Sequence, residues 1–351
     1  NYYRLVREAE ITIAGSGGGI GNGAGYYYPN AFENEQWNNM AVNQSDHTVK
    51  QMQETCITVT WMKFCFQMLR LVGESEIADD MEISIYNALL AALKDEGVEV
   101  ASYPYIFDYF TSLVGQKPNP NAGAIEDAEG PIGSCCSANG HSGLGLVPFV
   151  GVMNSAEGPV VNLYHDSTVH ANGVTLDITG NYPFEDTVNI TVTPEVASEF
   201  TLKLRIPAWS AKNTVLVNGE AQTGVTAGEY YAITRTWSVG DTVTLILDLR
   251  TRVVNDLAGM GKIALMRGPI VLARDARFGD TELTAISDVA DVDGYVDAKL
   301  VEPVFDSQIT VSVPCEDGTS VLFCDYPSAG QTWTSESRYA VWMIEAGVLP
   351  V

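Results

Sequence analysis

The sequence predicts a multidomain α + β protein in which a helical region is followed by antiparallel β-sandwich domains. The hydrophobic pattern is helical before about residue 155, and after residue 158 apolar and polar residues alternate with a period of two. The chain has 351 residues and 46% apolar content, enough for two or three domains with separate cores. We expect domains at residues 1–155, 156–260 and 261–351, the last being a partial or complete sandwich.

Two apolar runs in the first region predict a helical hairpin. Residues 56–72 are apolar on nearly all sides, and Gly73 follows as a C-terminal stop. Residues 76–94 form the second run, which ends before Gly97. A helix that is apolar on most sides is buried between others, and the short Gly-Glu-Ser link makes the two helices antiparallel neighbours.

Short alternating segments predict the strands of the second region. They are residues 188–193, 200–206, 214–217 and 242–249. Turn signals fall around them, at Asn172-Gly173, Asn218-Gly219 and Gly240-Asp241. This spacing is typical of an antiparallel β-sandwich, and we expect a second β unit from near Gly261 to the end.

The charge balance excludes one class of partner. Lysine and arginine number 19 against 44 acidic residues, which gives a net charge of −25. Such a field repels phosphate backbones, so we expect no nucleic acid partner, whereas a neutral sugar is indifferent to it. No stretch approaches the roughly 18–20 apolar residues of a membrane span, so none is expected.

The glycine-rich residues 13–25 do not form a phosphate-binding loop. They lack the Gly-Lys-Ser/Thr ending, and no strand–helix unit surrounds them. We expect a flexible loop over a cleft instead.

Six cysteines are too few for a disulfide scaffold in a chain of this length. Cys65 lies in the first helical run and is expected in the core. Cys315 and Cys324 flank a turn-like segment, so they either form a disulfide across a hairpin or are buried thiols.

Four residues could form a metal site. Glu54 and Cys56 lie at the head of the first buried helix, and Cys135 and Cys136 follow a long loop. Three thiolates and one carboxylate are sufficient for tetrahedral zinc, and thiolate favours zinc over calcium or magnesium. The competing interpretation is three buried cysteines and a surface glutamate, since the Cys-x-x-Cys spacing of zinc knuckles is absent.

The same residues resemble the motifs of a known family. Glu54-Thr55-Cys56, continuing through residues 59–63, looks like the Glu-Thr-Cys motif of glycoside hydrolase family 127, and residues 132–140 resemble its double-cysteine loop. Residues 204–209, 217–219 and 261–269 resemble its β-domain signatures. The matches keep the family's order over roughly residues 30–275, so together they are specific although each alone is weak.

The resemblance implies the C-terminal part of an (α/α)6 barrel followed by two antiparallel β-sandwiches, and a β-L-arabinofuranosidase-like glycoside hydrolase that retains configuration. It implies that Glu54, Cys56, Cys135 and Cys136 bind Zn2+ and that Cys135 is the nucleophile. The acid/base glutamate is expected at Glu35, with Glu33 as the alternative. The expected partner is a carbohydrate substrate.

Other side chains are candidates for substrate contact. Trp37 and Tyr28 could stack on sugar faces, or pack as ordinary loop aromatics. His141 follows the cysteine pair and either contacts substrate or is a structural or solvent-facing histidine.

The helical region is too short for a complete barrel. Residues 1–155 supply four or five of the roughly twelve helices needed, which leaves large apolar faces to be covered. We therefore expect the N-terminal half of the barrel in a missing segment or a second chain, and a homo-oligomer is also possible. Two alternative functions stay open: a related glycosidase for another plant-derived sugar, such as a branched acidic pectin sugar, and a non-catalytic carbohydrate-binding protein with structural zinc.

Overall fold

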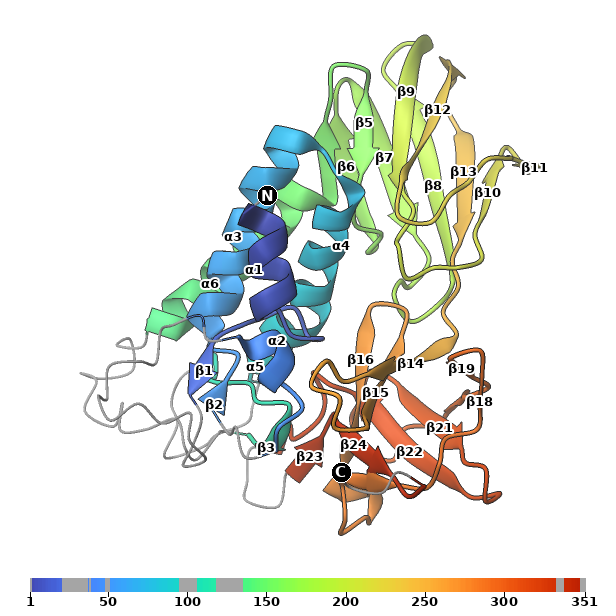
Figure 1. Ribbon diagram of the computed structural model, residues 1–351. Coiled ribbons are helices and arrows are strands. Elements are labelled where there is room, and N and C mark those ends of the chain that lie inside the picture. The colour runs from blue at the N-terminus through green and yellow to red at the C-terminus, as the bar shows by residue number, and fades with distance from the viewer. Residues whose placement is uncertain are drawn as a thin grey trace. The chain divides into compact units, whose positions relative to one another are not determined.

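The computed structural model describes residues 2–20, 37, 39–47, 51–94, 106–117, 135–332 and 338–347 (Figure 1). The chain forms two compact units, each assembled from segments that are separated in sequence. The first comprises Asn1–Lys63, Ile83–Leu144 and Arg250–Val351, and the second Phe64–Glu82 and Gly145–Leu249. The division into domains 1–155, 156–260 and 261–351 stays a prediction.

The helices are α1 (Tyr2–Glu10), α2 (Met40–Asn43), α3 (Thr55–Val72), α4 (Ser75–Ser84), the π-turn η1 (Ile85–Leu89), α5 (Leu90–Ala92), α6 (Cys135–Gly151) and the 3-10 turn η3 (Ala276–Phe278). Helix α3 confirms the first predicted helix to within one residue. The second predicted helix is interrupted by η1 and ends at Ala92. The reason lies in Asn87, whose buried amide donates to Pro269 O and accepts from Val271 N, each at 2.8 Å. The π-turn brings this side chain to the β15–β16 turn.

The second unit contains the strands β4 (Val152–Asn154), β5 (Pro159–Val161), β6 (Ser167–Ala171), β7 (Val174–Thr179), β8 (Thr187–Pro194), β9 (Ser198–Arg205), β10 (Thr214–Val217), β11 (Glu220–Ala221), β12 (Tyr230–Trp237) and β13 (Asp241–Ile246). They form one sheet in the order β11-β10-β13-β8-β7-β6 and another in the order β12-β9-β5-β4. Buried residues alternate along β7 and β8, as the period of two predicted. Asn172-Gly173 and Asn218-Gly219 form the predicted hairpin turns, each with positive φ at both residues.

The first unit contains β1 (Gly19–Ile20), β2 (Gln51–Met52), β3 (Val114–Gln116), β14 (Thr251–Asn255), β15 (Lys262–Arg267), β16 (Ile270–Asp275), β17 (Ala285–Ile286), β18 (Asp291–Val292), β19 (Tyr295–Val296), β20 (Lys299–Val301), β21 (Thr310–Pro314), β22 (Ser320–Asp325), β23 (Arg338–Ala340) and β24 (Met343–Glu345). Strands β18-β19-β14-β15-β16-β22-β21-β20 are neighbours in one sheet, with β23 paired to both β16 and β3. The chain after Arg250 is therefore mostly β-structure, and β3 links it to the helical segments of the same unit.

The two late cysteines are buried thiols, not a disulfide. Cys324 pairs with Thr310 at the far end of the β21–β22 hairpin, whereas Cys315 lies beside Thr319 at the turn. The register therefore separates the two sulfur atoms, because residues bridged across a hairpin must be opposite each other. Cys65 is fully buried, as expected.

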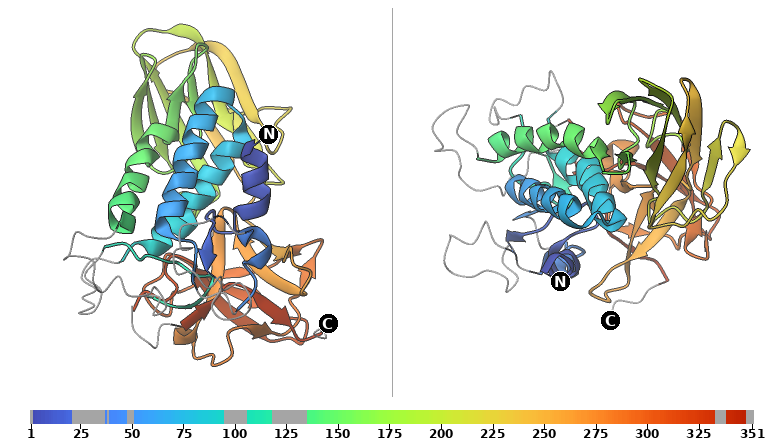
Figure 2. Two further views of the ribbon diagram at one scale, coloured as in Figure 1. Left: turned by 60° about the vertical axis from the view of Figure 1, so that its left-hand side comes forward. Right: turned by 90° about the horizontal axis from the view of Figure 1, so that it is seen from above.

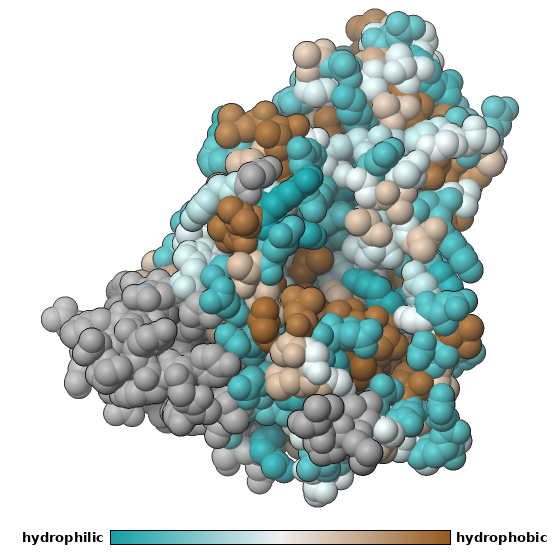
Figure 3. Space-filling view, viewed as in Figure 1, coloured by the Kyte–Doolittle hydropathy of each residue, from teal (hydrophilic) through white to brown (hydrophobic). Residues whose placement is uncertain are grey.

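Several helices expose large apolar side chains, visible as brown areas among the teal surface (Figure 3). Tyr2 and Leu5 on α1 are 72% and 64% exposed, and Leu71 on α3 is 78% exposed. None of the described helices has the length and apolar character needed to cross a bilayer.

Candidate metal centre

Glu54 and Cys56 are placed by the start of α3. Glu54 forms an isolated β-bridge with Phe110, and its carbonyl accepts the backbone N–H of Thr58 in the first helical turn. The Thr55 side chain donates to Asp108 O at 2.7 Å, and its backbone N–H donates to Tyr109 O. Residues 108–110 therefore hold the backbone of Glu54 and Thr55 at the start of α3.

Cys135 and Cys136 lie in the first turn of α6. The segment is helical although it contains glycines, because the helix packs very closely on its neighbours. A Cβ at Gly140 would lie 2.4 Å from the Phe107 ring, and one at Gly143 would lie 2.8 Å from Val59 of α3. Only glycine leaves room for this approach, and the first turns of α3 and α6 lie side by side (Figure 2).

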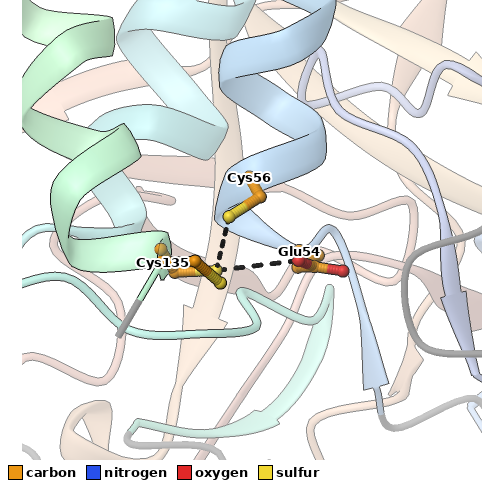
Figure 4. A group of neighbouring side chains, drawn as sticks. Glu54, Cys56 and Cys135 are labelled. Carbon is orange, nitrogen blue, oxygen red and sulfur yellow. Dashed lines mark hydrogen bonds between the residues drawn. The ribbon is translucent and has the colours of Figure 1, made fainter. Parts of the chain in front are cut away.

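These two helix starts bring the four predicted ligands together (Figure 4). The ligand atoms of Glu54, Cys56, Cys135 and Cys136 all lie within 4.8 Å of one another. Cys136 Sγ is 3.2 Å from Cys56 Sγ, 80 residues away in the sequence, and 3.8 Å from Glu54 Oε1. Glu54 and Cys136 are buried, Cys56 is half-buried and Cys135 is exposed. None of the three cysteines is in a disulfide.

The electrostatics of the cluster favour a cation. Hydrogen bonds to the Cys135 and Cys56 thiols, followed by burial, raise the pKa of Cys136 far above its ordinary value. The Cys136 thiol is the donor in its contacts with Cys56 Sγ and Glu54 Oε1. Four negatively charged ligands cannot share one pocket without a positive charge. The donor set therefore fits a metal ion that replaces the thiol protons.

The remaining predicted site residues are not all placed. Glu33, Glu35 and Tyr28 lie outside the described residues. Trp37 is 40% exposed, and its ring lies so close to Gly17 that a Cβ there would be 2.7 Å from it. Exposed His141 hydrogen-bonds through Nδ1 to Ser137 O of its own helix, at 2.7 Å. A substrate role for Trp37, Tyr28 or His141 stays a prediction.

Two polar residues beside the cluster were missed by sequence reasoning. Asn139 donates from Nδ2 to Cys56 Sγ at 3.2 Å, and its Oδ1 accepts from Lys63 Nζ, also at 3.2 Å. Helical spacing would have found them, because Asn139 is three residues after Cys136 and Lys63 is seven after Cys56. Residues 132–140 were compared with a double-cysteine loop and were therefore not tested for helical spacing.

The backbone before Glu54 is strained. Gln53 is fully buried at a positive φ of 59°, a conformation that is uncommon outside glycine. Neither polar atom of its side-chain amide has a hydrogen-bond partner within the described ranges. Its backbone N–H donates to Gly18 O and its carbonyl accepts from Thr111 N. These two hydrogen bonds hold Gln53 in its strained conformation, next to the candidate ligand Glu54.

Comparison with known proteins matches two successive family models. Residues 12–144 match the catalytic domain of the GH127 β-L-arabinofuranosidases, and residues 159–249 match the middle domain of the same family. The chain belongs to glycoside hydrolase family 127. The Glu54–Cys136 cluster lies in the part of this GH127 chain that matches the catalytic domain.

The chain is also similar to individual proteins of this family. The GH127 chain is 28% identical over 237 residues to a non-reducing end β-L-arabinofuranosidase of Bifidobacterium longum subsp. longum, a match that covers 62% of this chain and 34% of the relative. It resembles the crystal structure of a GH127 β-L-arabinofuranosidase from Geobacillus stearothermophilus T6 with a TM-score of 0.76 at 21% identity, over 98% of this chain and 55% of that one. A second solved GH127 β-arabinofuranosidase gives 0.72 at 18% identity, over 97% and 54% of the two chains. The chain thus spans about a third of the curated relative and about half of each solved one.

Proposed function

We propose that this GH127 chain is the C-terminal portion of a retaining glycoside hydrolase that cleaves terminal β-L-arabinofuranosyl or related residues. The observation that carries the proposal is the convergence of Glu54, Cys56, Cys135 and Cys136 within 4.8 Å, in the segment matching the GH127 catalytic domain. An exposed sulfur lies next to buried ligands in this cluster, which suits a site that both holds a metal and meets a substrate.

Zinc is the proposed metal. One carboxylate and three sulfur donors are a tetrahedral set, and sulfur favours zinc over calcium and magnesium. A bound zinc ion would supply the positive charge that keeps the sulfurs as thiolates near neutral pH. Buried Glu54 and Cys136 would serve as fixed ligands.

Cys135 is the proposed nucleophile because its side chain is the exposed member of the cluster. Its Sγ would attack the anomeric carbon, forming a C–S bond while the C–O bond to the leaving group breaks. Glu35, or Glu33 as the alternative, would give the leaving oxygen a proton. The same carboxylate would then take a proton from the water that breaks the C–S bond, so configuration is retained after two inversions.

The proposed architecture follows the family. The helical segments form part of an (α/α)6 barrel, and the sheets of the second unit pack as a β-sandwich, with a further sandwich near the C-terminus. Exposed apolar residues on α1, such as Tyr2 and Leu5, support the expectation that further helices cover the barrel. Those helices would come from a further segment of the same protein or from another chain.

The test compares the turnover of the Cys135→Ala variant with that of Cys65→Ala, which removes a sulfur outside the cluster. Purified protein is assayed on β-L-arabinofuranosides and on acidic pectin oligosaccharides, with zinc counted by mass spectrometry and product anomers followed by NMR. Cys135→Ala should lose turnover by at least about a thousandfold while Cys65→Ala, a core thiol outside the cluster, keeps it. Unchanged turnover in Cys135→Ala would remove the nucleophile assignment. In protein that also contains the rest of the barrel, turnover only on another sugar would select the related-glycosidase alternative, and zinc with no turnover on any substrate would select the non-catalytic one.

A further inference from the structure

The three sulfurs of the metal centre have different surroundings. Cys136 is buried, Cys135 is exposed, and half-buried Cys56 accepts a hydrogen bond from the Asn139 side chain, with Nδ2–Sγ at 3.2 Å. A nitrogen donor to a metal-bound sulfur stabilises the thiolate and fixes its direction, as outer-sphere partners of metal ligands do. This contact requires that the Asn139 amide is held in one orientation, with its nitrogen facing Cys56.

Lys63 determines which end of the Asn139 amide faces the sulfur. An ammonium group has three donors and no acceptor, so only the amide oxygen can bind it. Lys63 Nζ lies 3.2 Å from Asn139 Oδ1, which leaves the amide nitrogen to face Cys56. A flipped amide would place its NH2 against the ammonium and its oxygen against the sulfur, and both contacts would be repulsive.

The two helices supply the partners in a fixed register. Cys56 and Lys63 are seven residues apart on α3, which is two turns and therefore the same side of the helix. Cys136 and Asn139 are three apart on α6, again on one side. The close α3–α6 contact allowed by Gly140 and Gly143 brings these two sides together.

We propose that Asn139, oriented by Lys63, is a positioning residue that keeps Cys56 as a permanent metal ligand. The hydrogen bond spreads the negative charge of the Cys56 sulfur and makes it a poorer nucleophile than exposed Cys135. This division of roles between sulfurs rests on the proposed function, whereas the effect on metal binding does not.

The test measures metal binding and the spectrum of the cobalt-substituted protein. Asn139→Asp keeps the shape but replaces the N–H donor with a carboxylate oxygen, so zinc affinity measured by chelator competition should fall about tenfold or more. Lys63→Met should lower it by a smaller factor, because the amide is then free to flip. With Co(II) bound, loss of the N–H donor should move the sulfur-to-cobalt charge-transfer band to lower energy, a shift that a purely structural role would not produce.

Two controls separate this effect from net charge. Ala138→Asp adds the same negative charge at the neighbouring exposed position of α6, and Lys299→Met removes a surface lysine of the β-region. Both should bind zinc like the parent protein.

The proposal is overturned if Asn139→Asp matches Ala138→Asp in affinity, or if its charge-transfer band stays in place. Because Lys63 is exposed, Lys63→Met is expected to fold even if Asn139→Asp does not, and unchanged affinity together with an unshifted band in that variant would equally overturn it. Absence of glycosidase activity in protein that contains the complete barrel, with the affinity pattern intact, would remove the proposed function and leave this inference standing.

Discussion

Arg205 and Glu82 form an ion pair in which both side chains are completely buried, with Nη2 and Oε1 2.5 Å apart. The other terminal nitrogen of Arg205 pairs with Asp79, and its Nε donates to Asn162 O. All three charged residues belong to the second unit, where they join α4 to strand β9. Removing one member of such a buried network leaves the charges of the others without a partner, which destabilises the fold.

Replacing Arg205 with methionine should therefore destabilise the protein strongly. The substitution leaves two buried carboxylates without their cation, which costs about 3–5 kcal/mol in the free energy of unfolding. Urea denaturation measures this loss in the free energy of unfolding. Lys203→Met on the same strand is the matched control, because Lys203 pairs with exposed Glu157 and should contribute less than about 1 kcal/mol. Equal losses in the two variants would contradict the prediction.

The same network predicts a pH dependence of stability. Burial raises the pKa of Asp79 from 3.8 to about 6, although nearby Arg205 acts in the opposite direction. A folded-state pKa above the unfolded one means that the folded protein binds the proton more tightly. This contribution to stability is fully present below pH 3.8 and is lost as the pH rises through 6, with a total of about 3 kcal/mol.

Asp79→Asn should remove that slope. Urea midpoints measured between pH 4.5 and about 7.5 should fall with pH in the parent and change less steeply in the variant. Asp79 accepts from Arg205 and from the Ala208 N–H through different oxygens, and an amide has only one oxygen, so the variant is also expected to lose one of these hydrogen bonds. An identical slope in both proteins would show that Asp79 is not the titrating group.

The glycines of α6 give a prediction with an internal control. Gly140→Ala and Gly143→Ala would force a methyl group against Phe107 and Val59, and we expect losses of about 1–3 kcal/mol. Gly145 lies on the same helix with no atom within 4 Å of an added Cβ, so Gly145→Ala should stabilise by about 0.5–1 kcal/mol. Thermal denaturation of the three variants checks the order. A loss in Gly145→Ala equal to that in Gly140→Ala would show that close packing is not the reason for the glycines.

Metal removal should lower stability through the cluster. A metal that binds only the folded chain stabilises it by about 2.7 kcal/mol at a hundred times its dissociation constant. A strong chelator should therefore lower the melting temperature, and added zinc should restore it. Cys136→Ala should abolish the response to both, whereas Cys324→Ala, a buried thiol outside the cluster, should keep it. A chelator effect of full size in Cys136→Ala would place the metal elsewhere.

Much of the local structure follows from short-range patterns. The apolar run of α3, the alternation along β8 and β13 and the Asn-Gly turns depend on neighbouring residues, and sequence alone predicted them. The type of metal ligand is likewise a property of the residues, since sulfur and carboxylate donors are chosen by the chemistry of Glu54 and the cysteines. The family resemblance then identified Glu54, Cys56, Cys135 and Cys136 as one set, which the structure brings together.

Contacts between distant segments were decided only by the tertiary structure. Helix α6 packs closely on Phe107 at Gly140, although no local pattern connects these two residues. Asn139 reaches Cys56 only because α3 and α6 are so close, and the separation of Cys315 from Cys324 depends on strand register. The physical reason is the same in each case: period and propensity act within a few residues, whereas packing distance and register arise when segments far apart in sequence are buried against each other.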